Sequence, residues 1–179
     1  MCTRNYHPME HSTLTLLDEI RAVKEERGRP LAPPATVEEL RMLQEEAAQK
    51  LDYVLPAIYL ELLSYTNGIA HNGMQLYATH ALTRTTPDGQ TTYDRRGLVE
   101  TNLLWRDTPP NQEFVFLAES GDVLYGQHIP TGQFQVVDRI TNEMDDPKTG
   151  AYATLDPLLE RLFHEMLNHF DILNYRSES

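Results

Sequence analysis

Histidine and carboxylate groups are the side chains in this sequence with the types and spacing to bind a metal ion, and seven histidines are present. His164 and His169 bracket a stretch similar to the H-E-x-x-H zinc motif, with one residue too many between them. At about 100° per residue, these imidazoles lie roughly 140° apart on a helix and cannot share one ion. Pairing of Glu160 with His164 and of Glu165 with His169 on a solvated helix face explains the stretch without a metal.

Other patterns for metal binding and nucleophilic chemistry are also incomplete. Glu143, Asp145 and Asp146 could form an oxygen cage, yet the segment lacks the D-x-[DN]-x-[DN]-G order of a calcium loop. Cys2 has no base held against it, and Ser120 lacks the first glycine of a G-x-S-x-G elbow. The nine glycines form neither a phosphate loop nor a G-x-G-x-x-G fingerprint. We therefore expect a protein that is not an enzyme, with no catalytic residue, no metal and no cofactor.

The charge balance narrows the class of partner. The 179 residues carry 27 Asp and Glu against 15 Lys and Arg, a net charge of −12. Nucleic-acid phosphates and anionic membranes repel such a chain, whose largest basic run is the pair Arg95-Arg96. No apolar run approaches the roughly 18 residues that cross a bilayer. Residues 1–11 lack the apolar centre of a secretory signal, and a single cysteine forms no internal disulfide. We expect a cytoplasmic protein that binds neither nucleic acid nor membrane.

The spacing of apolar residues predicts which elements position these groups. One helix is predicted over residues 12–27, stopped by Gly28, and another over 36–51, opened by a capping box of Thr36 and Glu39. Three more helices are predicted: from Pro56 to a left-handed cap at Asn67-Gly68, over 96–106, and from a cap at Asp156 along an apolar stripe to Phe170.

Short runs rich in Val, Phe and Tyr predict strands over residues 73–79, 114–118, 123–129 and 134–139. The turn-forming residues between the last three runs favour an antiparallel meander. The predicted fold class is α+β, with N-terminal helices, a central antiparallel sheet meander and a C-terminal helix packed on the sheet. We expect a flexible N-terminus over residues 1–11 and one domain over 12–175 with an N-terminal helical extension over 12–35.

The segment LPAIYLELLSYTNG, residues 55–68, resembles the SMI1/KNR4 (SUKH) superfamily, in which an acidic helix precedes an L-P-x-x-Y helix ending in N-G or a similar dipeptide. The second half is similar to that family in its strand and helix segments, namely residues 114–118 with Ser120-Gly121, 123–126, 134–138 and 152–167. The segment from Leu98 to Arg106 is similar to the bacterial branch named after YrhA. The resemblance covers residues 36–170.

The resemblance implies a protein-binding role, because many bacterial members are immunity proteins that bind a cognate toxin and block its toxic site. A net charge of −12 then favours a basic toxin as the partner. Two alternatives stay open at this point. One is an SMI1/KNR4-type regulatory or scaffold protein with no toxin partner, and the other is a cryptic hydrolase or metal-dependent enzyme in which His71, His80 and His128 converge. The sequence leaves the oligomeric state open.

Partner-binding residues concentrate in loops, so the acidic residues on predicted turns or loops are our candidates for contact with a basic partner. They are Asp88, Asp94, Glu119, Asp122, Glu143, Asp145 and Asp146. Interface hot spots are more often aromatic, so three aromatic residues are rival anchors if they are exposed and core residues if they are not. These are Tyr93, Trp105 and Tyr125.

Overall fold

The helices begin and end at residues whose chemistry favours those boundaries. The computed structural model describes residues 7–85, 87–145 and 150–168. Its helices are α1 (His11–Glu26), α2 (Val37–Leu51), α3 (Ala57–Tyr65), α4 (Leu98–Trp105) and α5 (Asp156–Met166), with a 3-10 helix over Pro109–Glu113. The predicted capping box of α2 is confirmed: the Thr36 hydroxyl accepts from the Glu39 N–H at 3.1 Å, and the Glu39 carboxylate accepts from the Thr36 N–H at 2.7 Å.

The end of α1 is a Schellman motif centred on Gly28, whose φ is +66°. The Gly28 N–H donates to the Glu25 carbonyl and the Arg29 N–H donates to the Lys24 carbonyl, both at 2.9 Å. The predicted stop at Gly28 is therefore confirmed. The motif also fixes the direction in which the chain leaves the helix.

The predicted helix cap at Asn67-Gly68 is wrong. Helix α3 ends at Tyr65, and Thr66 is already extended with φ −158°. Instead, the Asn67 side chain forms two hydrogen bonds with Thr79, one to its hydroxyl and one from its N–H, both 2.9 Å long. Gly68 has the positive φ that was expected, but it leads the chain into the first strand.

The predicted cap at Asp156 is also wrong. Leu155 occupies the N-cap position of α5, and Asp156 is the first residue of the helix. The buried Asp156 carboxylate accepts hydrogen bonds from the Glu10 N–H at 2.9 Å and from the Thr13 hydroxyl at 3.0 Å. It therefore joins α5 to the start of α1, where Met9 is buried as well.

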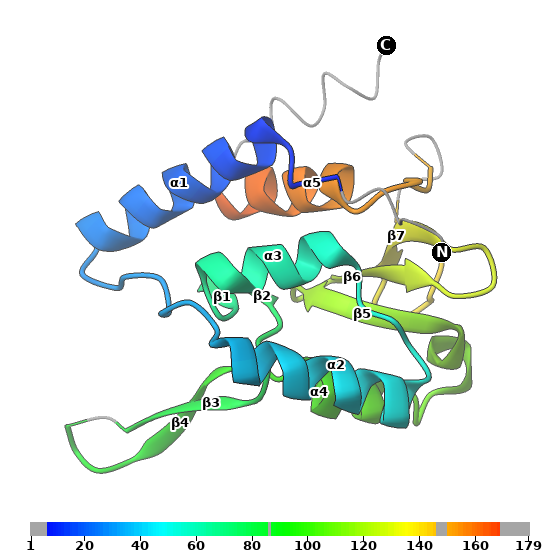
Figure 1. Cartoon of the computed structure of the whole chain (residues 1–179), viewed down its shortest axis with the longest axis horizontal. Coiled ribbons are helices and arrows are strands. Elements are labelled where there is room, and N and C mark those ends of the chain that lie inside the picture. The colour runs from blue at the N-terminus through cyan, green and yellow to red at the C-terminus, as the bar shows by residue number, and fades with distance from the viewer. Residues whose placement is uncertain (1–6, 86, 146–149, 169–179) are drawn as a thin grey trace.

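The main sheet has five antiparallel strands in the order β1-β2-β5-β6-β7. These strands are β1 (Ile69–His71), β2 (Met74–Leu76), β5 (Phe114–Glu119), β6 (Val123–His128) and β7 (Gln133–Asp138). A separate hairpin of β3 (Leu82–Thr85) and β4 (Thr91–Arg95) projects from the body at lower left in Figure 1. The predicted meander of the last three strands is confirmed.

The predicted strand over residues 73–79 is confirmed only for β2, Met74–Leu76, which pairs with β1 in a hairpin that the sequence analysis did not predict. Its turn is Asn72-Gly73, with φ +56° and +78°. Both residues adopt positive φ readily, and the resulting turn matches the twist of two paired strands. This hairpin puts β1 at one edge of the sheet.

Strand β7 forms the opposite edge, and the chain that follows it covers that edge. Phe134 and Tyr152 exchange two backbone hydrogen bonds of 2.8 Å. Between them, the Asp145 N–H donates to the Val136 carbonyl at 2.9 Å. The segment after β7 therefore lies along its outer side.

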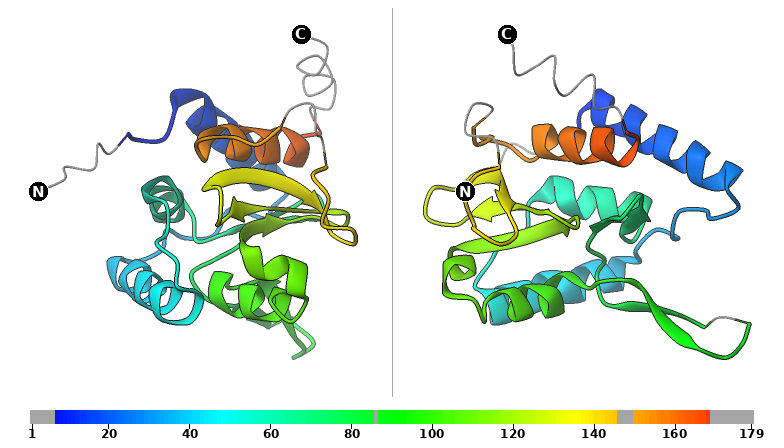
Figure 2. Two further views of the ribbon diagram at one scale, coloured as in Figure 1. Left: turned by 90° about the vertical axis from the view of Figure 1, so that its right-hand side faces the viewer. Right: turned by 180° about the vertical axis from the view of Figure 1, so that it is seen from behind.

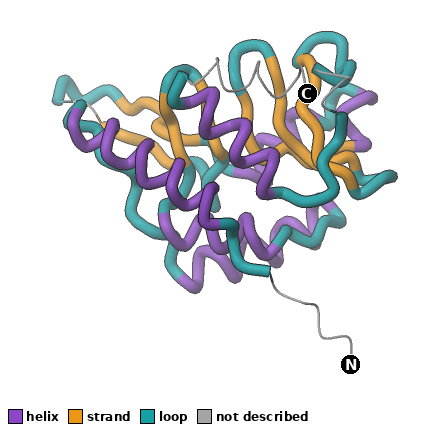
Figure 3. Tube along the Cα trace, turned by 90° about the horizontal axis from the view of Figure 1, so that it is seen from above, coloured by secondary structure: helices purple, strands orange, loops and turns teal. Residues whose placement is uncertain are grey.

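Helices cover both faces of the sheet. Helices α1 and α5 lie side by side over one face, α2 and α4 lie over the other, and α3 lies beside the sheet between these layers (Figures 1 and 2). Seen from above, α1 and α5 cross the strands (Figure 3). All six residues of β5 are buried, which agrees with cover on both faces. The α+β fold class is thus confirmed, and α5 packs on the sheet as predicted.

Candidate functional site

The loop that follows β7 is ordered by one carboxylate. Asp138 accepts hydrogen bonds from the backbone N–H groups of Ile140 and Thr141, both at 2.8 Å. These bonds hold the pKa of Asp138 below its usual value, because they favour the charged carboxylate. Asn142 then adopts a left-handed conformation with φ +59° and donates its side-chain N–H to the Asn111 side chain at 2.7 Å. Hydrogen bonds, and not buried apolar side chains, therefore hold this loop in place.

Ile140 stands at the tip of this loop with 93% of its surface exposed. A fully exposed isoleucine forgoes about 1.5–3 kcal/mol that burial would contribute, so the position does not serve the fold. Its backbone N–H donates to the Asp138 carboxylate at 2.8 Å, which orders the main chain at this position. An apolar group presented from an ordered loop meets a partner with little loss of conformational entropy.

Backbone hydrogen bonds bring acidic residues together around Ile140. The Arg139 N–H donates to the Asp122 carbonyl at 2.9 Å, and the Asp138 N–H donates to the Glu143 carbonyl at 2.8 Å. Asp122 and Glu143 are exposed. We call this surface the acidic rim, defined by Asp122, Asp138, Ile140, Glu143 and Asp145. Three of the predicted candidates, Asp122, Glu143 and Asp145, thus lie at one end of the sheet.

An ion-pair network supports the acidic rim from below. Arg161 of α5 contacts both the Asp145 carboxylate and Glu165, the second through a 2.9 Å bond from its Nε. The Tyr125 hydroxyl donates to the other Glu165 oxygen. Tyr125 is only 1% exposed, so the hypothesis that it is a partner anchor is wrong. Burial and the neighbouring Glu165 carboxylate raise the pKa of Tyr125, which keeps its hydroxyl protonated.

Glu119 also differs from its prediction as a loop residue. It is the last residue of β5 and is buried, with an ion pair to Arg96 at 3.0 Å. Its second carboxylate oxygen accepts from the Tyr77 hydroxyl at 3.0 Å, and that hydroxyl accepts from Trp105 Nε1 at 3.1 Å. Burial and Glu119 raise the pKa of Tyr77. Glu119 therefore joins β5 to α4 and is a poor candidate for partner contact.

Trp105 is half-buried and has one face against a cation. The Arg139 guanidinium lies 4.9 Å from its ring centre, and Arg139 Nη1 also donates to the Ser120 carbonyl at 3.0 Å. These contacts position Arg139 beside the β5–β6 turn, at the border of the acidic rim. Trp105 therefore supports the rim through Arg139 and remains partly accessible.

The remaining candidates lie elsewhere. Asp88 is exposed in the turn between β3 and β4. Tyr93 and Asp94 lie on β4, so Asp94 is on a strand and not on a loop as predicted, and their side chains are outside the described part of the structure. Asp146 lies outside the described residues. The rim thus contains three of the predicted acidic residues, and Asp138 and Ile140 are the two members that sequence reasoning missed.

The histidines lie against different neighbours. His80 is 3.9 Å from Glu39, His128 contacts the Glu113 carboxylate at 3.3 Å, and His71 lies on β1. Within residues 7–85, 87–145 and 150–168, no group of three or more His, Cys, Asp or Glu side chains is arranged to hold a metal ion. The Ser120 hydroxyl accepts from the Val123 N–H at 3.1 Å, as in an ordinary turn. His169 and Phe170 lie outside the described residues.

Two further observations concern the chain as a whole. None of the helices among the described residues combines the length and apolar character needed to cross a membrane. No protein-family model matches the sequence, and no curated protein matches it. The resemblance to the SMI1/KNR4 superfamily therefore stays a prediction.

Proposed function

We propose that this chain is a non-enzymatic protein-binding module of the SMI1/KNR4 type, and that it acts as a cytoplasmic immunity protein that neutralises a basic toxin by occluding it. The observation that carries the proposal is Ile140, a 93% exposed apolar side chain on an ordered loop between carboxylates. An exposed apolar group in an acidic setting matches a basic surface that contains an apolar pocket.

The carboxylates and the apolar Ile140 side chain contribute differently to recognition. The carboxylates of Asp122 and Glu143 attract a basic partner over the Debye length, about 8 Å at physiological salt, and so raise the association rate. Ile140 contributes once the surfaces touch, because its burial removes apolar area from water. The Asp138 hydrogen bonds reduce the entropy that the loop loses on binding. Steric coverage of the toxic site then requires no chemistry from this chain.

The product of a neighbouring gene is the partner to test. We would co-express it with this chain in a sensitive host, score survival, and measure the dissociation constant of the purified pair. We expect protection, and we expect binding that weakens between low and high salt because the attraction is partly electrostatic. If the product neither binds the chain nor is neutralised by it, the proposal fails. Tight binding without protection would favour the regulatory or scaffold role.

Ile140→Ser tests the contact itself, with Val37→Ser as the matched control. Val37 is 86% exposed at the start of α2, so both changes remove an exposed β-branched group. We expect Ile140→Ser to weaken binding by about thirtyfold or more, the scale of an interface hot spot, and Val37→Ser to leave it unchanged. Equal effects of the two substitutions would remove Ile140 from the interface. Thermal unfolding of both variants checks that the fold is intact.

A further inference from the structure

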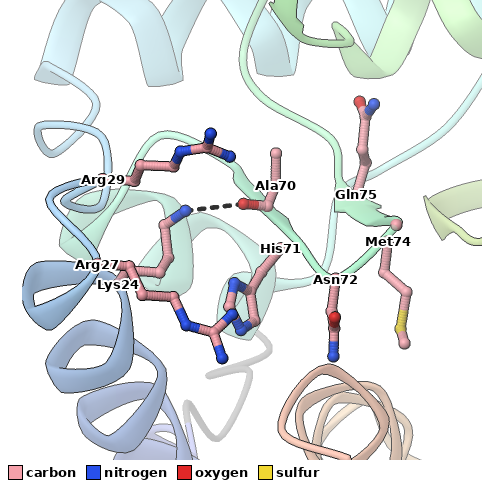
Figure 4. A pocket seen from close by; sticks show the side chains of 9 residues that line it. Lys24, Arg27, Arg29, Ala70, His71, Asn72, Met74 and Gln75 are labelled. Carbon is pink, nitrogen blue, oxygen red and sulfur yellow. Dashed lines mark hydrogen bonds between the residues drawn. The ribbon is translucent and has the colours of Figure 1, made fainter.

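A pocket of about 660 Å³ lies at the β1 edge of the sheet, remote from the acidic rim in strand order. The last turns of α1, the residue after its cap and the β1–β2 hairpin line it (Figure 4). The lining residues are Lys24, Arg27, Arg29, Ala70, His71, Asn72, Gly73, Met74 and Gln75. A volume of this size is ordinary for small-molecule sites, which span about 300–1,000 Å³.

The charge of this pocket is opposite to that of the protein. Three of the 15 Lys and Arg residues line it, although the chain as a whole carries −12. None of the nine lining residues, all in the described part of the chain, is acidic. The three cations lie together on the α1 side of the pocket, as Figure 4 shows.

Lys24 is held in place by the sheet. Its side chain is buried, and Nζ donates to the carbonyl oxygen of Ala70 on β1 at 2.8 Å. Figure 4 shows this bond directed at the strand from the α1 side. A buried lysine with a fixed ammonium group supplies positive potential at the pocket wall at no further entropic cost.

Arg27 and Arg29 are positioned by the Schellman motif. The 2.9 Å bond from the Arg29 N–H to the Lys24 carbonyl turns the chain so that residues on both sides of Gly28 line the same hollow. Both arginine residues are exposed and can adjust to a ligand. A helix C-terminus attracts cations by itself, which accounts for Lys24 and Arg27 but not for the presence of Arg29 and His71 on the same pocket.

The pKa of His71 depends on the electrostatic potential in the pocket. Its pKa is lowered below the usual value by partial burial, and then by the positive charges of Lys24 and Arg27. Figure 4 shows Arg27 extending toward the His71 ring. An anion placed between these groups would offset the two charge effects, so His71 provides a spectroscopic readout of binding.

We propose that this pocket binds the phosphate group of a small phosphomonoester. Such a phosphate carries about −1.5 to −2 charges at pH 7 and three acceptor oxygens. Two guanidinium groups can engage these oxygens with paired N–H donors, and the Lys24 ammonium adds a fixed charge. The Asn72 amide lies at the turn of the hairpin and donates one N–H to the Met166 carbonyl at 3.1 Å, so this bond directs it toward α5. The site is independent of the proposed protein-binding function.

Binding is tested with the full chain at constant ionic strength, by calorimetry and by the NMR shift of the His71 imidazole. The probes are inorganic phosphate, glycerol 3-phosphate, acetate and a phosphoserine peptide. We expect saturable binding of the first two, a rise in the pKa of His71 on binding, and weaker binding of acetate. Acetate binding as tight as phosphate would overturn the assignment to phosphate. A peptide that binds more tightly than glycerol 3-phosphate would overturn the assignment to a small molecule.

Arg29→Gln identifies the site, and Arg41→Gln is the matched control. Arg41 is an exposed cation on α2 that pairs with Glu38 and Glu45, and both substitutions change the net charge equally. We expect Arg29→Gln to weaken phosphate binding at least fivefold and Arg41→Gln to leave it unchanged, since charge-assisted hydrogen bonds are lost only in the first. Equal losses in the two variants would show that net charge, and not this pocket, governs binding. Thermal unfolding of Arg29→Gln verifies that the variant is folded.

Discussion

The two edges of the main sheet differ in charge and in the way their charges are placed. At the β7 edge, the acidic rim presents solvated carboxylates and Ile140 from a loop that Asp138 orders. At the β1 edge, a helix cap and a hairpin enclose cations in a pocket. The rim is a protruding surface suited to another macromolecule, whereas the pocket is a hollow suited to a small anion. The shape of a charged surface therefore indicates the class of partner better than the sign of its charge does.

Lys24→Met should have the largest effect and acts on the pocket alone. The substitution keeps most of the buried side-chain volume but leaves the Ala70 carbonyl without its Nζ donor. We expect a loss of about 1.5–3 kcal/mol in the free energy of unfolding, the contribution of a hydrogen bond from a charged donor, together with weaker phosphate binding. Urea denaturation measures the first.

Lys50→Met is the control, because Lys50 pairs with Glu46 at 3.5 Å on the surface of α2. Exposed pairs of this kind contribute about 0–1 kcal/mol. If both substitutions destabilise the protein equally, then the hydrogen bond from Lys24 to Ala70 contributes no more stability than an exposed ion pair. Unchanged binding of Lys24→Met to the proposed partner would show that the two edges act separately.

Tyr125→Phe should have an intermediate effect and acts on the support of the acidic rim. It removes the hydroxyl donor to Glu165 while the ring stays in the core. We expect a loss of about 1–2 kcal/mol in the free energy of unfolding, because the acceptor is charged but keeps its ion pair with Arg161. Tyr53→Phe is the comparison, since that hydroxyl donates to the neutral Gln127 side chain at 2.6 Å. A larger loss for Tyr53→Phe would contradict the importance of the charged acceptor.

The smallest expected effect is the dependence of stability on pH that is caused by His71. Because the pKa of His71 is lower in the folded chain than its usual 6.5, the unfolded chain binds this proton more readily. The contribution of His71 to stability is therefore fully present above pH 6.5 and is lost as the pH falls toward the folded pKa. NMR titration of the imidazole measures that pKa. Arg27→Gln should raise it, because one of the positive charges that lower it is removed. Titration of the wild-type His71 above pH 6.5 would contradict the charge environment of the pocket.

Local signals in the sequence predicted the elements whose boundaries are set by neighbouring residues. The capping box at Thr36 and Glu39, the stop at Gly28 and the β5–β7 meander each depend on residues within a few positions of one another. The β1–β2 hairpin was predictable from Asn72-Gly73, but its three-residue strands are too short to show alternation.

Features that depend on distant partners were not predictable. Glu119 and Tyr125 belong to acidic and aromatic types that suit an interface, yet Tyr77 and Glu165, both far away in sequence, bury them. Ile140 is an apolar residue close to the end of β7, and its spacing in the sequence does not show that it lies exposed on a loop ordered by Asp138. The pocket was missed for the same reason, because its cations come from the end of α1 and the residues just after it, whereas its histidine comes from β1.

The bonds on the outer sides of β1 and β7 limit how another chain can attach to this sheet. Ala70 already receives the Lys24 ammonium, while Phe134 and Val136 are bonded to Tyr152 and Asp145. A foreign strand that sought to extend the ladder would have to displace these groups first. Pairing of a foreign strand with the outer side of β1 or β7 is therefore hindered, so in concentrated solution these two edges of the main sheet are poor templates for stacking one copy onto the next.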